Sequence, residues 1–111
     1  MPIVNCFLKE KYFDQSVFDA LTEDWSIEIG VSLKDITINW MSANNQSGKS
    51  YEAIIHLYLP TVWSEDQVAK IQLSLSKQIA KHFDLDSKQV FIMTSVIKSG
   101  HVVSNGEVEK W

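Results

Sequence analysis

The residue best placed to do acid–base chemistry is Pro2, which follows Met1 and opens an apolar stretch that ends at Leu8. The initiator methionine is usually removed ahead of a small residue, and Pro2 would then carry a free secondary amine at the end of a buried strand. Burial among apolar groups lowers the pKa of such an amine, and a base with a pKa near the working pH transfers protons efficiently. Pro2 is therefore the candidate catalytic base. The alternative is a structural role, because proline is tolerated at the first residue of a strand.

Groups that could hold an anionic substrate are few, because the sequence contains no arginine. All ten basic residues are lysine, which excludes a bidentate arginine–carboxylate clamp. An anion would have to be held by lysine, histidine or backbone N–H groups. Lys98 and His101, in the tail, are candidates for anion binding or proton relay; the alternative is an exposed polar tail.

The composition predicts one globular domain over residues 1–111, with 45% apolar and 22% charged residues. A net charge of -4 without a basic stripe argues against a nucleic-acid partner. No apolar run reaches the roughly 20 residues of a membrane helix, and no secretory signal is recognisable. We therefore expect a cytoplasmic protein with no membrane partner.

The cysteine and histidine residues do not predict a metal site. Cys6 is the only cysteine, which rules out an internal disulfide and fits a reducing compartment. The three histidines are far apart in the sequence and lack metal-ligand spacing. The four glycines are not clustered, so no phosphate-binding loop is indicated. We expect neither a metal nor a cofactor.

Hydrophobic periodicity and capping signals predict the order strand, helix, strand, loop, strand, helix, strand and hairpin tail. Asp14 and Gly30 are the expected caps of the first helix, and Ser64 with Gln67 forms a capping box before the second. Asn105-Gly106 is a two-residue hairpin signal. The expected strands cover 2–8, 36–41, 51–59 and 89–96, and the expected helices 15–29 and about 65–83. The chain thus divides into halves 2–43 and 51–96 and a tail 97–111.

This order predicts an α+β fold with two layers. Two β-α-β units would pair their strands in a four-stranded mixed sheet, with both helices on one face and a C-terminal hairpin. The same order also fits a ferredoxin-like sandwich. The strands carry apolar residues at both parities, as in Ile54 and Ile55. We interpret this as a sheet covered on both sides, the second cover being other subunits of a homo-oligomer, and we expect a trimer.

Four features make the chain resemble the tautomerase superfamily: Met-Pro at the start of the first strand, the doubled β-α-β order, the length and the short β-rich tail. That superfamily includes macrophage migration inhibitory factor and 5-carboxymethyl-2-hydroxymuconate isomerase. The tail with Asn105-Gly106 is most similar to a small bacterial family of unknown function within it. The resemblance implies a trimer with Pro2 at the base of a pocket between subunits, and proton transfer on small 2-oxo or unsaturated acids.

The other pocket residues depart from the family pattern. Val31 stands where migration inhibitory factor has a pocket lysine, and the nearest lysine is Lys34. Phe91 replaces a pocket tyrosine and lacks its hydroxyl, and Thr37 stands where the isomerase has an arginine. The resemblance thus implies a base without its usual polarising groups, which removes stabilisation of the developing oxyanion. The candidate substrate-binding residues are Lys34, Thr37, Phe91, Lys98 and His101.

Three functions follow from these residues. The first is a Pro2-dependent keto–enol tautomerase or isomerase that acts on a small 2-oxo or unsaturated acid. The second is a non-catalytic small-molecule-binding or interaction module on the same trimeric scaffold. The third is a ferredoxin-like ligand-binding or dimerisation domain. Retention of Met1 would make the Pro2 nitrogen an amide, which is not basic, and would favour the other two.

Overall fold

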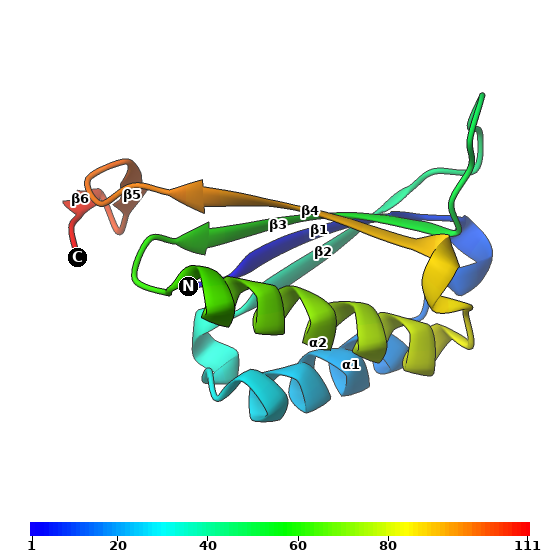
Figure 1. Cartoon of the computed structure of the whole chain (residues 1–111), viewed down its shortest axis with the longest axis horizontal. Helices are drawn as coiled ribbons and strands as arrows, with labels where there is room; N and C mark the ends of the chain where they lie inside the picture. The colour runs from blue at the N-terminus through cyan, green and yellow to red at the C-terminus, as the bar shows by residue number, and fades with distance from the viewer.

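The computed structural model describes all residues, 1–111, and contains a mixed sheet, two long helices and a small hairpin (Figure 1). The order of elements is that predicted from the sequence. The strands are β1 (Ile3–Leu8), β2 (Thr37–Ser42), β3 (Ala53–Pro60), β4 (Val90–Ile97), β5 (Val102–Ser104) and β6 (Glu107–Glu109). The helices are α1 (Gln15–Ile29) and α2 (Glu65–Phe83), with short 3-10 turns η1 (Glu10–Tyr12), η2 (Leu33–Asp35) and η3 (Ser87–Gln89).

The sheet has the strand order β2-β1-β3-β4, and this order decides between the two expected folds. Within each β-α-β unit the two strands are direct neighbours and parallel: β1 pairs with β2, and β3 with β4. The units meet through an antiparallel pairing of β1 with β3. A ferredoxin-like sandwich splits each unit by inserting another strand, so that alternative was wrong.

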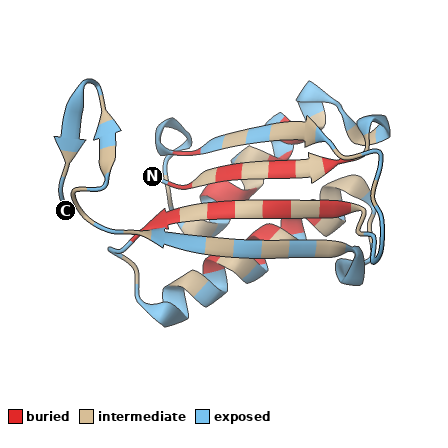
Figure 2. Cartoon of the chain, turned by 90° about the horizontal axis from the view of Figure 1, so that it is seen from above, coloured by how far each residue is buried: buried red, intermediate tan, exposed pale blue.

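Both helices cover one face of the sheet and leave the other free (Figures 1 and 2). The alternate residues of β1 and β3 that point toward the helices are buried, among them Val4, Ile55 and Leu57. Phe18, Leu21 and Trp25 of α1 and Ile71, Leu75 and Ile79 of α2 meet them from below. Neither helix is long and apolar enough to cross a membrane.

The helix ends form as their capping residues predict. The Asp14 side chain accepts a hydrogen bond from the Ser16 N–H, and Gly30 ends α1 with a positive φ of 71°. Ser64 and Gln67 exchange both hydrogen bonds of the capping box at the start of α2. These contacts satisfy backbone groups that a helix end would otherwise leave unpaired.

All four predicted strands start one or two residues too early, and for β2 and β3 the contacts give the reason. Ile36 is not in β2 because its N–H donates to Leu33 and closes the 3-10 turn η2. Tyr51 is not in β3 because its N–H and carbonyl both bond the Gln46 side chain. The glutamine therefore closes the loop over 46–51, and strand pairing begins two residues later, at Ala53.

The face of the sheet that the helices leave free, here called the open face, carries three rows of side chains in register. One outer row is apolar, the other combines an isoleucine and a tyrosine with a threonine and a serine, and the middle row is polar apart from one methionine. The Asn39 amide donates to Asn5 at 3.0 Å, and the His56 ring lies 5.3 Å from that of Phe7. Reading from β2 to β4, the rows are Thr37–Ile3–Tyr58–Ser95, Asn39–Asn5–His56–Met93 and Met41–Phe7–Ile54–Phe91.

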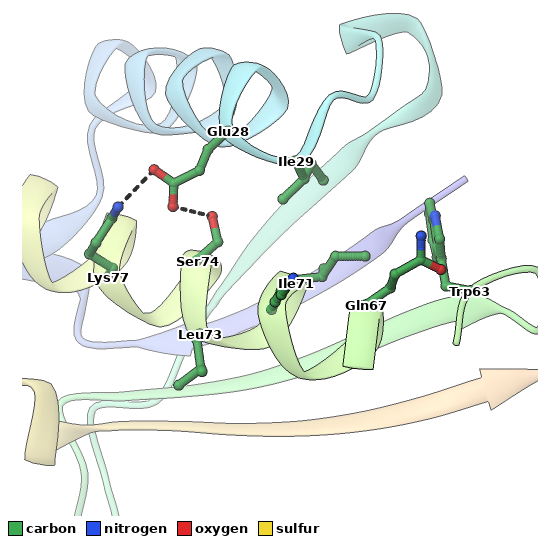
Figure 3. Close-up of a pocket in the computed structure, with 9 residues that line it drawn as sticks. Glu28, Ile29, Trp63, Gln67, Ile71, Leu73, Ser74 and Lys77 are labelled. Atoms are coloured by element: carbon green, nitrogen blue, oxygen red, sulfur yellow. Dashed lines mark hydrogen bonds and ion pairs between the residues drawn. The ribbon is translucent and has the colours of Figure 1, made fainter. Parts of the chain in front are cut away.

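A polar seam joins the two helices on their outer side. Glu28 of α1 accepts hydrogen bonds from Ser74 at 2.6 Å and Gln78 at 3.1 Å, and pairs with Lys77 at 2.8 Å (Figure 3). The Lys77 ammonium and the Ser74 hydroxyl hold the pKa of the Glu28 carboxyl below its usual range. The carboxylate therefore fixes α1 against α2 in its ionised form.

The buried stripe of α2 gives a stability prediction. Leu75→Ala should destabilise the protein by roughly 2–5 kcal/mol, because Leu75 is fully buried and its truncation leaves a cavity. Leu73→Ala is the matched control on the same helix, since Leu73 is 71% exposed. Urea unfolding of both variants checks the prediction, and equal losses would contradict the assigned helix phase.

The Glu28 contacts give a pH prediction. The pKa of Glu28 is lower in the folded than in the unfolded protein. The ionised Glu28 therefore contributes to folding stability above its unfolded-state pKa, and this contribution is lost as the pH falls through its folded-state pKa. Glu28→Gln should cost on the order of 1 kcal/mol at pH 7, after allowance for solvent screening. The difference from the unmodified protein should shrink towards pH 3. Glu23→Gln, on the exposed side of α1, is the control for urea unfolding at both pH values.

Candidate functional site

The start of β1 lies at a meeting point of four strands. Because β2 is parallel to β1 and β3 is antiparallel to it, Ile3 lies between Thr37 at the start of β2 and Tyr58 near the end of β3. β4 ends at the same edge, and the hairpin β5–β6 follows it (Figure 1). Residues far apart in the sequence therefore surround the N-terminus.

Pro2 is fully buried at this edge. The Pro2 carbonyl accepts a hydrogen bond from the Thr37 N–H at 3.1 Å, which anchors the first residues to β2. Met1 is 38% exposed. In this form of the chain the Pro2 nitrogen is an amide and has no basicity.

A polar cavity of about 380 Å³ lies on one side of Met1. Lys34, Asp35 and Thr37 form its wall on the β2 side. The hairpin forms the opposite wall through Ser104, Asn105 and Glu109. Asn105 and Gly106 have φ of 54° and 76°, so the predicted two-residue turn forms and carries its amide side chain to this cavity.

An apolar cavity of about 260 Å³ lies on the other side of Met1. Its lining combines the ends of β3 and β4 with the tail: Met1, Ile3, Tyr58, Leu59, Pro60, Ile97, His101, Val102 and Trp111. Trp111 is held in place because its ring N–H donates to Thr61 at 2.8 Å and its backbone N–H to Ser99 at 2.8 Å. The tail is thus a fixed wall of this cavity.

Met1 and Ile3 line both cavities, so Met1 is the partition between them. Burial lowers the pKa of the Met1 α-amino group, while the carboxylates of Asp35 and Glu109 act in the opposite direction. Two carboxylates therefore face the N-terminus. Pro2 itself lines neither cavity, and removal of Met1 would leave its nitrogen as an amine next to the residue that lines both.

The structure brings together some of the predicted site residues. Lys34 and Thr37 line the polar cavity, and His101 lines the apolar one, so all three surround the N-terminus. Lys98 is exposed and lines neither cavity. Phe91 lies at the opposite end of the open face, in register with Ile54 and Phe7.

Sequence reasoning missed the acidic part of the site. Asp35 and Glu109 were not among the predicted site residues. The signal that could have found Glu109 was the hairpin turn at Asn105-Gly106. A two-residue turn there pairs Val102 with Glu109. This pairing returns the chain to the edge of the sheet where the N-terminus lies. Trp111 was likewise recognisable only from the path of the tail.

A further cavity of about 400 Å³ lies between the helices, at the C-terminal end of α1 (Figure 3). Glu28, Ser74 and Lys77 line it, but these groups already bond to one another. Glu28 and Lys77 therefore hold the helices together, and Lys70 is the one charged side chain of this cavity without an ion pair. The cavities beside Met1 have free polar side chains and are the better candidate site.

No protein-family model and no curated protein sequence matches the chain. Solved structures, in contrast, match it over nearly its whole length. The R7 fused 4-OT wild-type asymmetric trimer has a TM-score of 0.81 at 19% identity, covering 96% of this chain and 94% of that one.

Two other matches come from differently named proteins. N1, a member of the cis-3-chloroacrylic acid dehalogenase (cis-CaaD) family, has a TM-score of 0.77 at 14% identity, with 96% of this chain and 82% of that one covered. Macrophage migration inhibitory factor from Oncomelania hupensis has a TM-score of 0.73 at 13% identity, with 99% and 83% covered. By its strand order, its paired β-α-β units and these similarities, the chain has the fold of the tautomerase superfamily.

Proposed function

We propose that this protein, after loss of Met1, is a Pro2-dependent tautomerase that moves a proton within a small carbonyl compound such as a 2-oxo or unsaturated acid. The observation that carries the proposal is the position of Pro2. It is buried between Met1 and Ile3, both of which line an apolar and a polar cavity. The similarity to fused 4-OT and to a macrophage migration inhibitory factor supports the same reaction class.

The proposed step needs no redox partner. The uncharged Pro2 nitrogen accepts a proton from the carbon next to a carbonyl group, and the C–H electron pair forms the C=C bond of an enolate. The carbonyl π electrons move to the oxygen, where Lys34, Thr37 or Asn105 of the polar cavity can stabilise the charge. Protonation of the oxygen gives the enol and, through the Pro2 ammonium or water, restores the base.

A non-catalytic binding module is the alternative, and one observation favours it. With Met1 in place, the Pro2 nitrogen is an amide and Met1 fills the space between the cavities. A protein that keeps Met1 could hold an apolar ligand against Tyr58 and Trp111 without any proton transfer.

We also propose that the protein is a homotrimer. The open face exposes Met93 by 49% and Phe91 by 38%, and its other apolar residues are only half-buried. A second copy is the fitting cover, because fused 4-OT structures of this fold are trimers. Since Phe91 lies at the far end of this face, it would reach a site only in a neighbouring subunit.

The catalytic proposal is tested with phenylpyruvate tautomerisation by protein whose N-terminus has been verified by mass spectrometry. Met1-free protein should show weak turnover that rises with pH as the Pro2 amine loses its proton. Protein that retains Met1 and the Pro2→Gly variant should lose this activity, and Lys34→Ala should lower it several-fold. Full activity in Pro2→Gly or in Met1-retaining protein would exclude Pro2 as the base.

The trimer is tested by light scattering at micromolar concentration. The unmodified protein should have three times the mass of one chain, and Met93→Glu should give monomers because it places a charge in the covered face. Leu73→Glu is the control, since Leu73 is exposed on the helix side. A monomeric unmodified protein, or equal effects of the two variants, would contradict the proposal.

A further inference from the structure

The charge of the polar cavity departs from what a carboxylate substrate requires. Among the side chains that line it, that of Lys34 is the only cation, and those of Asp35 and Glu109 are both acidic. None of these three side chains forms an ion pair or a hydrogen bond within the chain. The carboxylates are therefore not neutralised by a partner and act on whatever enters the cavity.

The hairpin holds one of these carboxylates in place. The backbone of Glu109 accepts a hydrogen bond from the Gly100 N–H at 2.9 Å and pairs with Val102 in the hairpin. Asp35 ends the 3-10 turn η2, whose first residues are capped by the Ser32 side chain. Both acidic groups thus stand on ordered backbone on opposite sides of the N-terminus. Both line the same cavity as Met1, so they lie beside the position where chemistry would occur.

A neighbouring subunit would not reverse this charge through the open face. That face contains no lysine, aspartate or glutamate, and the ionisable groups in its rows are His56 and Tyr58. A copy packed against it through the same face adds apolar and amide groups, the Tyr58 phenol and the His56 imidazole, but no lysine. With Pro2 uncharged, as a base must be, the lining of the cavity sums to one negative charge.

We propose that the site at Pro2 selects uncharged or cationic carbonyl compounds with an apolar substituent over compounds that carry a carboxylate. This inference rests on the proposed function and revises its substrate class: the 2-oxo and unsaturated acids named above become the poorer substrates, and their uncharged analogues the better ones. The apolar cavity, with Tyr58 and Trp111, accepts the substituent, and the carbonyl group meets Lys34, Thr37 and Asn105. A carboxylate in that position would meet two like charges and one lysine, which cannot form a bidentate clamp.

The test compares phenylpyruvate with its methyl ester in Met1-free protein at pH 7. Each kcat/KM is divided by the uncatalysed rate of the same compound, so that intrinsic reactivity cancels. The ester should be preferred about tenfold or more, the size expected for repulsion between close charges in a partly desolvated site. The double variant Asp35→Asn with Glu109→Gln should reduce this preference at least threefold. Glu107→Gln, on the same hairpin but outside the cavity, should leave it unchanged.

Equal or better use of phenylpyruvate by the unmodified protein would overturn the proposal, as would an unchanged preference in a correctly folded double variant. Absence of turnover for both compounds contradicts the proposed function, and binding then tests the charge inference separately. Benzamide should perturb the NMR signals of the Trp111 ring N–H and of Asn105 at lower concentration than benzoate does. Equal or tighter binding of benzoate would overturn the inference in that case.

Discussion

The structure depends on one constraint: two helices can cover only one side of a four-stranded sheet whose central strands are apolar on both sides. Val4 and Ile55 lie under the helices, whereas their strand neighbours Ile3 and Ile54 belong to the open face. Covering apolar surface is the main favourable term in folding and association. The uncovered side of the sheet is therefore the surface that the proposed trimer would bury, and its middle row, with Asn39, Asn5 and His56, is polar.

The same topology explains why the candidate site lies where it does. An antiparallel pairing between two parallel units brings the starts of β1 and β2 and the ends of β3 and β4 to one edge. Any residue that precedes β1 must enter this edge, and any chain that continues after β4 must leave from it. Pro2 and the hairpin meet there because of strand order, so the tail can supply Asn105 and Glu109 to the N-terminus.

Local signals allowed most of the fold to be predicted. Asp14, Gly30 and the Ser64–Gln67 capping box fix helix ends through contacts within a few residues, and such contacts are readable from sequence. The start of β3 was misplaced because the Gln46 side chain bonds Tyr51, a contact that no periodicity reveals. Site residues from η2, such as Lys34, could be proposed by resemblance. That Asp35 and Glu109 line one cavity could not be predicted, because the position of Glu109 depends on the register of a hairpin that folds back after β4.

The partition formed by Met1 has a consequence for how the protein should be handled. Both chain ends lie at the edge of the sheet that carries the candidate site, whereas the loop over 43–52 lies at the opposite end (Figure 1). An affinity tag ahead of Pro2 would occupy the space between the cavities, and one after Trp111 would strain the indole contact with Thr61. Fluorophores, purification handles or surface-immobilisation groups are better inserted near Gly48, where added atoms meet open space.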